Sequence, residues 1–242
     1  MLGDSIYEIA HEKAGIIKSD VPVIVGKYQS SCDSVFIDSA KQCRSDIKFA
    51  SIARRMSKSN AADKLSGPFD IENEQTARYA LSYLNDYKII PIEAGAIGQG
   101  LSNFAQLTGY IGRWQVLNQK PTIIADSAHN IDALAQVIRR LLSMDYRNLR
   151  MVLGFVREKD LSGILKLLPK DAIYYLVRPV IFRAIDLDDL ARLFDDHDLD
   201  YRTIGSVSEG YNAGLTDAQE EDLMYVGGSS FVVGDLLGYL DK

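Results

Sequence analysis

The sequence contains little of what would suggest a secreted, membrane-spanning or nucleic-acid-binding protein. Its 242 residues include two cysteines, Cys32 and Cys43, which lie in one expected helical region without metal-ligand spacing. No apolar run approaches the roughly 20 residues that a membrane-spanning helix needs. The formal charge of −6 argues against nucleic acid or an anionic membrane as a partner. A reduced, cytoplasmic setting is therefore expected.

Two glycine-rich nucleotide-binding motifs are absent as well. The chain contains no phosphate-binding loop of the form Gly-x-x-x-x-Gly-Lys-Ser/Thr and no Gly-x-Gly-x-x-Gly dinucleotide motif. What is present is an ordinary globular composition, 47% hydrophobic and 25% charged. The length suffices to bury a core as one large domain or two small ones.

The first part of the chain mixes short helical and extended patterns. Helices are expected over residues 5–18, 33–43, 74–84 and 101–107, and a strand over residues 21–26. Asp33 is expected to cap its helix, and the polar stretch 51–67 predicts an irregular segment. Five glycines lie between Gly95 and Gly112, so we expect a domain boundary within residues 107–112.

The second part alternates regularly between strands and helices. Strands are expected over residues 122–126, 149–155, 172–177, 201–204 and 223–227. Helices are expected over residues 132–144, 160–168, 186–195, 207–215 and 231–240. This alternation predicts an α/β fold, Rossmann-like, in which helices cover both faces of a mostly parallel sheet.

Polar residues surround the strand at residues 122–126. Arg113 precedes this strand, next to Trp114, whereas Asp126 and His129 lie at its carboxyl end, just before a helix. Open α/β sheets bind ligands at the carboxyl ends of their strands, and a helix N-terminus attracts anions. An arginine, an aspartate and a histidine in this position indicate a phosphorylated ligand.

These segments resemble one known family. Gly112–Leu117 and Pro121–Asn130 are similar to the start of the C-terminal domain of folylpolyglutamate synthase/dihydrofolate synthase, in the Mur ligase superfamily. Four more segments resemble motifs of that family, namely Glu12-Lys13-Ala14-Gly15-Ile16, Gly154-Phe155-Val156-Arg157-Glu158-Lys159-Asp160, Phe182-Arg183-Ala184 and Gly227-Gly228-Ser229. The matching segments stand in the family order and extend over the whole chain, which argues against coincidence.

The resemblance implies that the chain is the C-terminal portion of a larger enzyme. In this family a phosphate loop lies far upstream, and the chain opens where the family pattern is already past its midpoint. We therefore expect residues 1–110 to be the truncated tail of a P-loop-type ATPase domain. Residues 111–242 are expected to be the Rossmann-like Mur ligase C-terminal domain. A natural split, proteolysis and deliberate shortening would all produce such a chain.

Two residues of the first part acquire roles from the resemblance. The family lysine that Lys13 matches is carbamylated, which makes it an oxygen ligand for Mg²⁺, and burial would keep such a lysine neutral enough to react. The family's metal-binding histidine falls just before Met1, and His11 is not its counterpart. Asn73 resembles an asparagine that meets the nucleotide, although Asp70 replaces the family's glutamine. The pattern alone indicates a solvated ion-pair face at Lys13 and a helix N-cap at Asn73.

The other site residues lie in the second part. Arg113 matches a family arginine that reaches the ATP phosphates, and Asp126 matches an aspartate of the nucleotide site. His129 matches a histidine near the incoming glutamate, and Lys159 is expected to point toward the same crevice. Ser229 could donate to a carboxylate or phosphate. From the pattern alone, Arg113 is a surface arginine and Asp126 is a helix cap. His129 is then a polar residue of a βα turn, and Ser229 is part of a glycine-rich turn.

The implied activity is an ATP- and Mg²⁺-dependent ligase of folate biosynthesis. It would add L-glutamate to dihydropteroate or to folates through an acyl phosphate, and the full-length enzyme would be a monomer. The 242-residue chain alone is expected to be inactive. Two alternatives stay open: another Mur-type ligase that acts on a cell-wall precursor, and a non-catalytic ligand-binding half-protein. The choice between the dihydrofolate synthase and folylpolyglutamate synthase activities is not made by this sequence.

Overall fold

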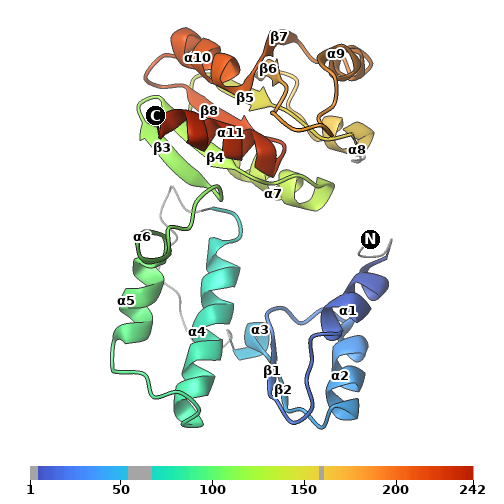
Figure 1. Ribbon diagram of the computed structural model, residues 1–242, viewed down its shortest axis with the longest axis vertical. Coiled ribbons are helices and arrows are strands. Elements are labelled where there is room, and N and C mark those ends of the chain that lie inside the picture. Colours follow the sequence, from blue (N-terminus) through green and yellow to red (C-terminus); the bar gives the residue numbers. More distant parts are fainter. Residues whose placement is uncertain (1–4, 54–66, 158–160, 242) are drawn as a thin grey trace. The chain divides into compact units, whose positions relative to one another are not determined.

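The computed structural model of the chain describes residues 5–53, 67–157 and 161–241 (Figure 1). These residues divide into two units. The first unit comprises residues 5–53 and 69–107, and the second comprises residues 67–68, 108–157 and 161–241.

The first unit combines helices with a two-stranded parallel sheet. Its elements are α1 (Ile6–Ala14), β1 (Val23–Val25), α2 (Asp33–Gln42), β2 (Ile47–Phe49), α3 (Ala50–Ala53), α4 (Asp70–Asp86), α5 (Ala96–Ser102) and α6 (Phe104–Thr108). Ser5 and Glu8 begin α1 with a reciprocal capping box, in which each side chain accepts a hydrogen bond from the other's backbone N–H. Helices α1 and α2 pack through a small buried cluster that includes Ala10 and Val35.

Several expectations for this unit were wrong in detail. The residue at the N-cap of α2 is Cys32, and the Asp33 carboxylate instead accepts a hydrogen bond from the backbone N–H of Gln29 at 2.7 Å. Helix α4 is longer at both ends than the expected 74–84. The pattern at 101–107 corresponds to the end of α5 and most of α6. Strand β2 and helix α3 were not predicted.

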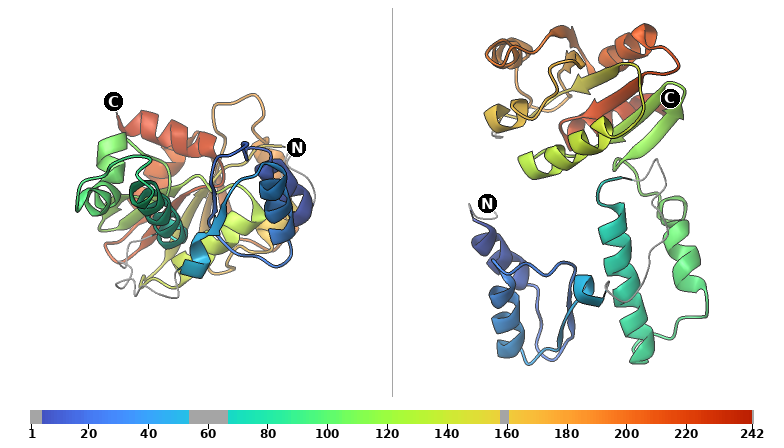
Figure 2. Two further views of the ribbon diagram at one scale, coloured as in Figure 1. Left: turned by 90° about the horizontal axis from the view of Figure 1, so that it is seen from below. Right: turned by 180° about the vertical axis from the view of Figure 1, so that it is seen from behind.

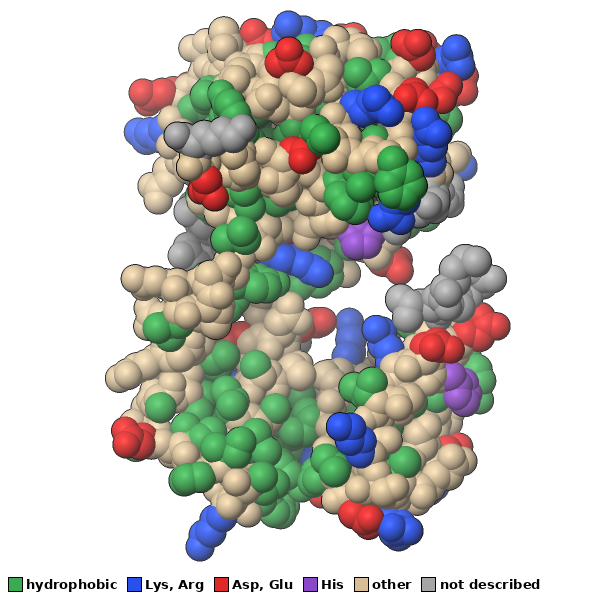
Figure 3. All heavy atoms as spheres, viewed as in Figure 1, with side chains coloured by type: hydrophobic (Ala, Val, Ile, Leu, Met, Phe, Trp, Pro, Cys, Tyr) green, Lys and Arg blue, Asp and Glu red, His purple; other side chains and the backbone are tan. Residues whose placement is uncertain are grey.

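Apolar side chains gather on the surface of this unit over α4 and α5 (Figure 3). The exposed hydrophobic residues on or next to α4–α6 are Tyr87, Ile89, Ile90, Phe104 and Leu107. Contiguous apolar surface of this kind is typical of a face that another segment of protein covers.

The second unit has the predicted α/β fold with a mostly parallel sheet. Its strands are β3 (Gln115–Gln119), β4 (Thr122–Asp126), β5 (Leu149–Leu153), β6 (Ile173–Val177), β7 (Tyr201–Gly205) and β8 (Leu223–Gly227). The strand order is β3-β4-β8-β5-β6-β7. Strand β3 is antiparallel to β4, and the other pairs are all parallel.

Helices cover both faces of this sheet, as predicted (Figures 1 and 2). They are α7 (Ile131–Leu142), α8 (Leu161–Leu165), α9 (Leu187–Asp195), α10 (Val207–Asp217) and α11 (Ser230–Leu240). The apolar residues of α7, α8 and α9 belong to one buried cluster, and those of α10 and α11 belong to a second. Fully buried side chains such as Val137 and Leu141 each contribute about 1.5–3 kcal/mol of transfer free energy. None of the described helices is both long and apolar enough to cross a membrane.

Candidate functional site

Three neighbouring strands of the second unit end at the same level. Strand β8 lies between β4 and β5, and Gly227 at its end pairs with Asp126 of β4 and with Leu153 of β5. The segments that follow these three residues therefore share one edge of the sheet. This is the carboxyl edge, at which open α/β sheets bind their ligands.

Asp126 ties two loops together at this edge. Its Oδ2 accepts a hydrogen bond from the backbone N–H of Trp114 at 2.7 Å, and its Oδ1 accepts one from the N–H of Ala128 at 2.8 Å. The Ser127 N–H donates in turn to the Gly112 carbonyl oxygen at 2.9 Å. The Asp126 side chain is 2% exposed. Its structural role is therefore to position the loop that carries Arg113, whereas direct binding of a nucleotide by Asp126 stays a prediction.

Arg113 projects from a backbone that is held on both sides. Gly112 and Trp114 both have positive φ, +77° and +40°, and a tryptophan in this region is strained by on the order of 1–3 kcal/mol. The buried Trp114 side chain and the Asp126 carboxylate stabilise the conformation. The Arg113 side chain is exposed. Its guanidinium is thus available to a ligand such as a phosphate, for which its flat fork of donors is suited.

His129 has a defined ring orientation. Its Nδ1 lies 2.9 Å from the carbonyl oxygen of Ser127. A carbonyl oxygen can only accept, so Nδ1 carries the proton and Nε2 of the neutral ring carries the lone pair. The side chain is half-buried. The following residue, Asn130, caps α7 by accepting a hydrogen bond from the Ala133 N–H. His129 can therefore present an acceptor at the carboxyl edge.

Ser229 lies where β8 passes into α11. Its Oγ accepts a hydrogen bond from the Val232 N–H at 3.2 Å, which makes Ser229 the N-cap of α11. Before it, Gly228 has φ +92°, and a Cβ there would lie 2.8 Å from the Gly154 carbonyl oxygen. Only glycine fits this close approach of the β8 and β5 termini. The pattern alone indicated part of a glycine-rich turn, and the N-cap role of Ser229 was not predicted. A ligand role for Ser229 stays a prediction.

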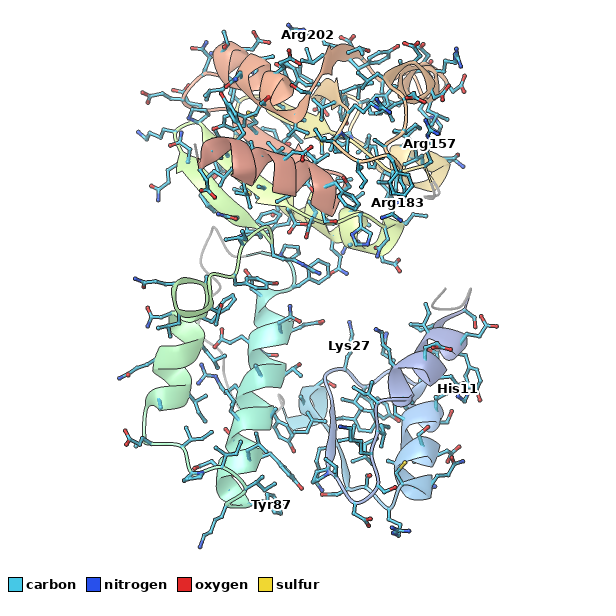
Figure 4. All side chains as sticks on the ribbon, viewed as in Figure 1. His11, Lys27, Tyr87, Arg157, Arg183 and Arg202 are labelled. Carbon is cyan, nitrogen blue, oxygen red and sulfur yellow. The ribbon has the colours of Figure 1, made fainter. Side chains whose placement is uncertain are left out.

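The loops after β5 and β6 bring arginines to the same edge. The Arg157 guanidinium pairs with Asp186, and Arg178 lies 3.4 Å from the other oxygen of the same carboxylate. The Arg183 guanidinium lies over the ring of Phe231. Figure 4 shows Arg157 and Arg183 on the same side of the second unit. Sequence reasoning used Arg157 and Arg183 only as parts of motifs. Lys159, predicted to be catalytic, lies outside the described residues.

Asn73 of the first unit lines a small pocket. Asn73 lies in the first turn of α4, and the N-cap of this helix is Phe69, so the N-cap reading of Asn73 was wrong. The pocket measures about 140 Å³, and Lys27 and Thr76 line it with Asn73. Polar side chains such as Asn73 and Thr76 in its lining are compatible with a nucleoside contact, which stays a prediction.

Lys13 lies in the last turn of α1, with an exposed side chain. The desolvation that would favour a neutral, carbon-dioxide-reactive lysine is therefore not supplied by the described part of the first unit. No group of three or more His, Cys, Asp or Glu side chains in the described residues could hold a metal ion. A magnesium site at Lys13 would need the oxygen of a carbamate and ligands from outside these residues.

Comparison with known proteins identifies the second unit. Residues 112–230 match the family described as "Mur ligase, glutamate ligase domain". These residues form a Mur ligase C-terminal domain. The matched range contains Arg113, Asp126, His129 and Ser229, so every predicted site residue of the second unit that the structure describes lies within the Mur ligase domain.

The whole chain is homologous to folylpolyglutamate synthases/dihydrofolate synthases. It is 28% identical over 258 residues to a probable bifunctional folylpolyglutamate synthase/dihydropteroate synthase of Haloferax volcanii. The aligned region covers 97% of the chain and 30% of the Haloferax protein. Two solved structures share the fold: E. coli FolC in complex with DHPP and ADP, and a bifunctional folylpolyglutamate synthase/dihydrofolate synthase of Yersinia pestis complexed with AMPPNP and Mn ion. Their TM-scores are 0.80 and 0.79, at 23% and 24% identity, and they cover 99% and 100% of the chain.

The chain spans less than two thirds of each of these relatives. It covers 58% of the E. coli and Yersinia chains, and the part it resembles is C-terminal. The assignment of residues 1–110 to an ATPase domain and of 111–242 to the C-terminal domain stays a prediction, because no comparison tests those boundaries.

Proposed function

We propose that the chain is the C-terminal portion of an ATP-dependent ligase that joins L-glutamate to dihydropteroate or to a folate. The observation that carries this proposal is the carboxyl edge of the Mur ligase domain. There an exposed arginine on a fixed loop, an oriented histidine and a helix-capping serine come from three separate segments. The domain description names a glutamate ligase, and relatives of E. coli and Yersinia pestis are named for the two folate activities.

The residues divide into a nucleotide side and a glutamate side. Arg113 binds the ATP phosphates, and Asp126 positions the Arg113 loop. Asn73 contacts the nucleoside through the pocket of the first unit. Lys13, once carbamylated, helps to hold Mg²⁺, which neutralises phosphate charge when it is bound. The ligands named for the two solved relatives include ADP, AMPPNP and Mn ion, which supports a nucleotide and a divalent metal.

On the glutamate side the chain mainly positions substrates. An oxygen of the acceptor carboxylate takes up the γ-phosphoryl group of ATP, which gives an acyl phosphate and ADP. The α-amino group of glutamate then attacks the acyl carbon, and phosphate leaves. His129, Lys159 and Ser229 line the side from which glutamate approaches, and Nε2 of His129 can accept a proton from the amine. Positioning and charge stabilisation are the principal contributions of a protein to such chemistry.

The 242 residues form one part of the working enzyme in this proposal. Residues 1–110 are the tail of the ATPase domain, and the apolar surface over α4 and α5 supports a further segment packed against it. Because the chain contains no phosphate loop, it does not turn over ATP alone. The complete enzyme is a cytoplasmic monomer.

The test is ADP release in the presence of Mg²⁺-ATP, L-glutamate, bicarbonate and either dihydropteroate or tetrahydrofolate. It compares the 242-residue chain with a version that also carries an upstream phosphate-loop half. Release only by the extended chain, and only with both co-substrates, is expected, and the preferred acceptor names the reaction. Turnover by the short chain would contradict the half-enzyme proposal. If neither chain releases ADP with these substrates but the extended chain turns over a cell-wall precursor, another Mur-type ligase is favoured.

A further inference from the structure

A buried tyrosine hydroxyl lies where β4 and β8 end, and the proposed division of roles does not use it. The two strands lie side by side, with Asp126 opposite Gly227 at their ends (Figure 1). Tyr225, in the middle of β8, is fully buried. Its Oη donates a hydrogen bond to the Asp126 carbonyl oxygen at 3.2 Å. The Tyr225 side chain therefore extends from the middle of the strand to the carboxyl edge of the sheet.

Gly227 leaves the space that this hydroxyl occupies. It follows Tyr225 by two residues in β8, and residues two apart in a strand face the same side of a sheet. A Cβ at Gly227 would lie 2.4 Å from the Tyr225 Oη and 2.5 Å from the Asp126 carbonyl oxygen. Any side chain at this position would displace the hydroxyl or the end of β4. The glycine and the tyrosine are therefore complementary, and together they set how β4 and β8 end.

The Tyr225 hydroxyl stays protonated in the folded chain. Burial holds its pKa well above the ordinary value, and the charge of the nearby Asp126 carboxylate acts in the same direction. A backbone hydrogen bond from Gly228 lowers the pKa without outweighing these two effects. A protonated hydroxyl can donate to one partner and accept from another. One side chain thus contacts the backbone of both segments that leave the strands.

These two segments carry the proposed site residues. The Asp126 loop, residues 126–130, contains His129, and the Asp126 carboxylate accepts hydrogen bonds from the N–H groups of the residues next to Arg113 and His129. The Ser229 turn, residues 227–229, ends at the N-cap of α11. The Tyr225 hydroxyl therefore lies between the backbone that holds Arg113 and His129 and the backbone that holds Ser229.

We propose that Tyr225 is a positioning residue of the carboxyl-edge site, and that its hydroxyl fixes the spacing between the Asp126 loop and the Ser229 turn. This inference rests on the proposed ligase function. In that function the groups that meet ATP phosphate and glutamate come from both segments, so a constant spacing is needed for them to act on one reaction. Small displacements of such groups weaken binding and slow the chemistry strongly. Because Tyr225 is buried, it acts through the backbone and not by touching a substrate.

Tyr225→Phe tests the proposal, because it removes one oxygen atom and keeps the ring. The 242-residue chain is first followed by amide hydrogen exchange in NMR. The N–H groups of Trp114 and Ala128, which the Asp126 carboxylate binds, should exchange at least about fivefold faster in the variant. The chain is then titrated with ¹³C-labelled L-glutamate. The variant should bind L-glutamate about threefold to tenfold more weakly than the wild type does.

Tyr174→Phe is the matched control. Tyr174 is also fully buried and belongs to the same apolar cluster, and its hydroxyl donates to a backbone carbonyl oxygen, that of Pro169, at 2.7 Å. It lies near the amino end of β6, and Pro169 precedes this strand, so the hydroxyl is remote from the carboxyl edge. Urea unfolding of the two variants should show similar losses of stability. Only Tyr225→Phe should change the exchange of Trp114 and Ala128 and the affinity for glutamate.

The possible outcomes separate this inference from the proposed function. Wild-type binding of glutamate, with the same affinity in Tyr225→Phe, would overturn the positioning role and leave the ligase proposal intact. Equal effects of Tyr225→Phe and Tyr174→Phe on exchange and affinity would also overturn it, because the loss would then follow from stability alone. Failure of the wild-type chain to bind glutamate at all would contradict both the glutamate side of the proposed function and this inference.

Discussion

The Asp126 carboxylate accepts a hydrogen bond from the backbone N–H of Trp114, 12 residues earlier in the chain, at 2.7 Å. This contact joins the carboxyl end of a central strand to the loop that enters the sheet. Because Trp114 has a φ of +40°, its backbone is strained, and the hydrogen bond to Asp126 helps to hold the loop in this conformation. The same buried carboxylate thus supports both the fold of the domain and the direction in which the neighbouring Arg113 projects.

Asp126→Asn should destabilise the chain by about 2–3 kcal/mol. An amide can accept at only one of its two ends, so its NH₂ group would face a backbone N–H in a site that is 2% exposed. Urea unfolding measures the loss. Asp132→Asn, at an exposed aspartate in the first turn of α7, is the control and should cost less than about 1 kcal/mol. Equal costs for the two variants would refute the role given to Asp126.

Ser229→Ala should combine a loss of stability with a loss of ligand binding. Removing the Oγ that caps α11 costs about 1 kcal/mol. Ser206 caps α10 in the same way, so Ser206→Ala should lose a similar amount of stability. Only the Ser229 variant should also bind L-glutamate more weakly, by about fivefold to tenfold. Glutamate titrations of both variants distinguish a binding residue from a helix cap, and equal affinities would leave Ser229 only the second role.

The neutral ring of His129 should carry its proton on Nδ1. The Ser127 carbonyl oxygen lies 2.9 Å from that nitrogen and can only accept. His197 should show the same tautomer, because its Nδ1 lies 2.8 Å from the Leu193 carbonyl oxygen. Nitrogen-15 chemical shifts of the histidine rings at a pH above their titration report the tautomers. A proton found mainly on Nε2 of His129 would remove its lone pair from the candidate site.

Asp222 should make the stability of the chain depend on acid pH. Burial raises the pKa of this carboxyl, but hydrogen bonds from Gln219, Asn148 and Arg150 outweigh burial and hold the pKa below its ordinary value. The folded carboxyl therefore binds its proton less tightly than the unfolded one. This contribution to the free energy of unfolding is present above about pH 4 and is lost as the pH falls through the lowered pKa.

Asp222→Asn should accordingly cost about 3 kcal/mol at pH 7, because it removes the negative charge that pairs with the buried Arg150. The variant should also lose less stability than the wild type between pH 6 and pH 3. Asp200→Asn removes an exposed carboxyl and should retain the wild-type slope. Urea unfolding at several pH values gives the comparison, and parallel slopes for Asp222→Asn and the wild type would contradict the role of this group.

Most of the sheet could be predicted because its four inner strands are buried on both faces. Strands β4 and β8 are short apolar runs between polar turns, and their predicted ranges agree with the structure. Strand β3 was missed because it is an edge strand whose Gln115, Asn118 and Gln119 give no apolar pattern. Strand β2 and helix α3 were missed because three or four residues carry too little periodicity to be recognised.

The site was predictable only where its residues share one segment. Asp126 and His129 follow a recognisable strand and precede a recognisable helix, so their place at the carboxyl edge could be inferred from the chain alone. The stacking of Arg183 on Phe231 could not, because α9, β7, α10 and β8 separate the two residues in sequence and only the sheet order brings them together. The buried state of the Asp126 carboxylate likewise depends on a loop that precedes the sheet.

In the proposed ligase reaction, which the Mur ligase domain serves, an oxygen of the acceptor carboxylate is transferred to phosphate. The most direct measurement uses dihydropteroate labelled with ¹⁸O in its carboxylate, together with Mg²⁺-ATP, L-glutamate and the chain extended by a phosphate-loop half. Mass spectrometry of the phosphate released per amide formed should find one ¹⁸O atom, because an acyl phosphate passes its former carboxylate oxygen to the leaving phosphate. Amide product accompanied by unlabelled phosphate would contradict the proposed mechanism.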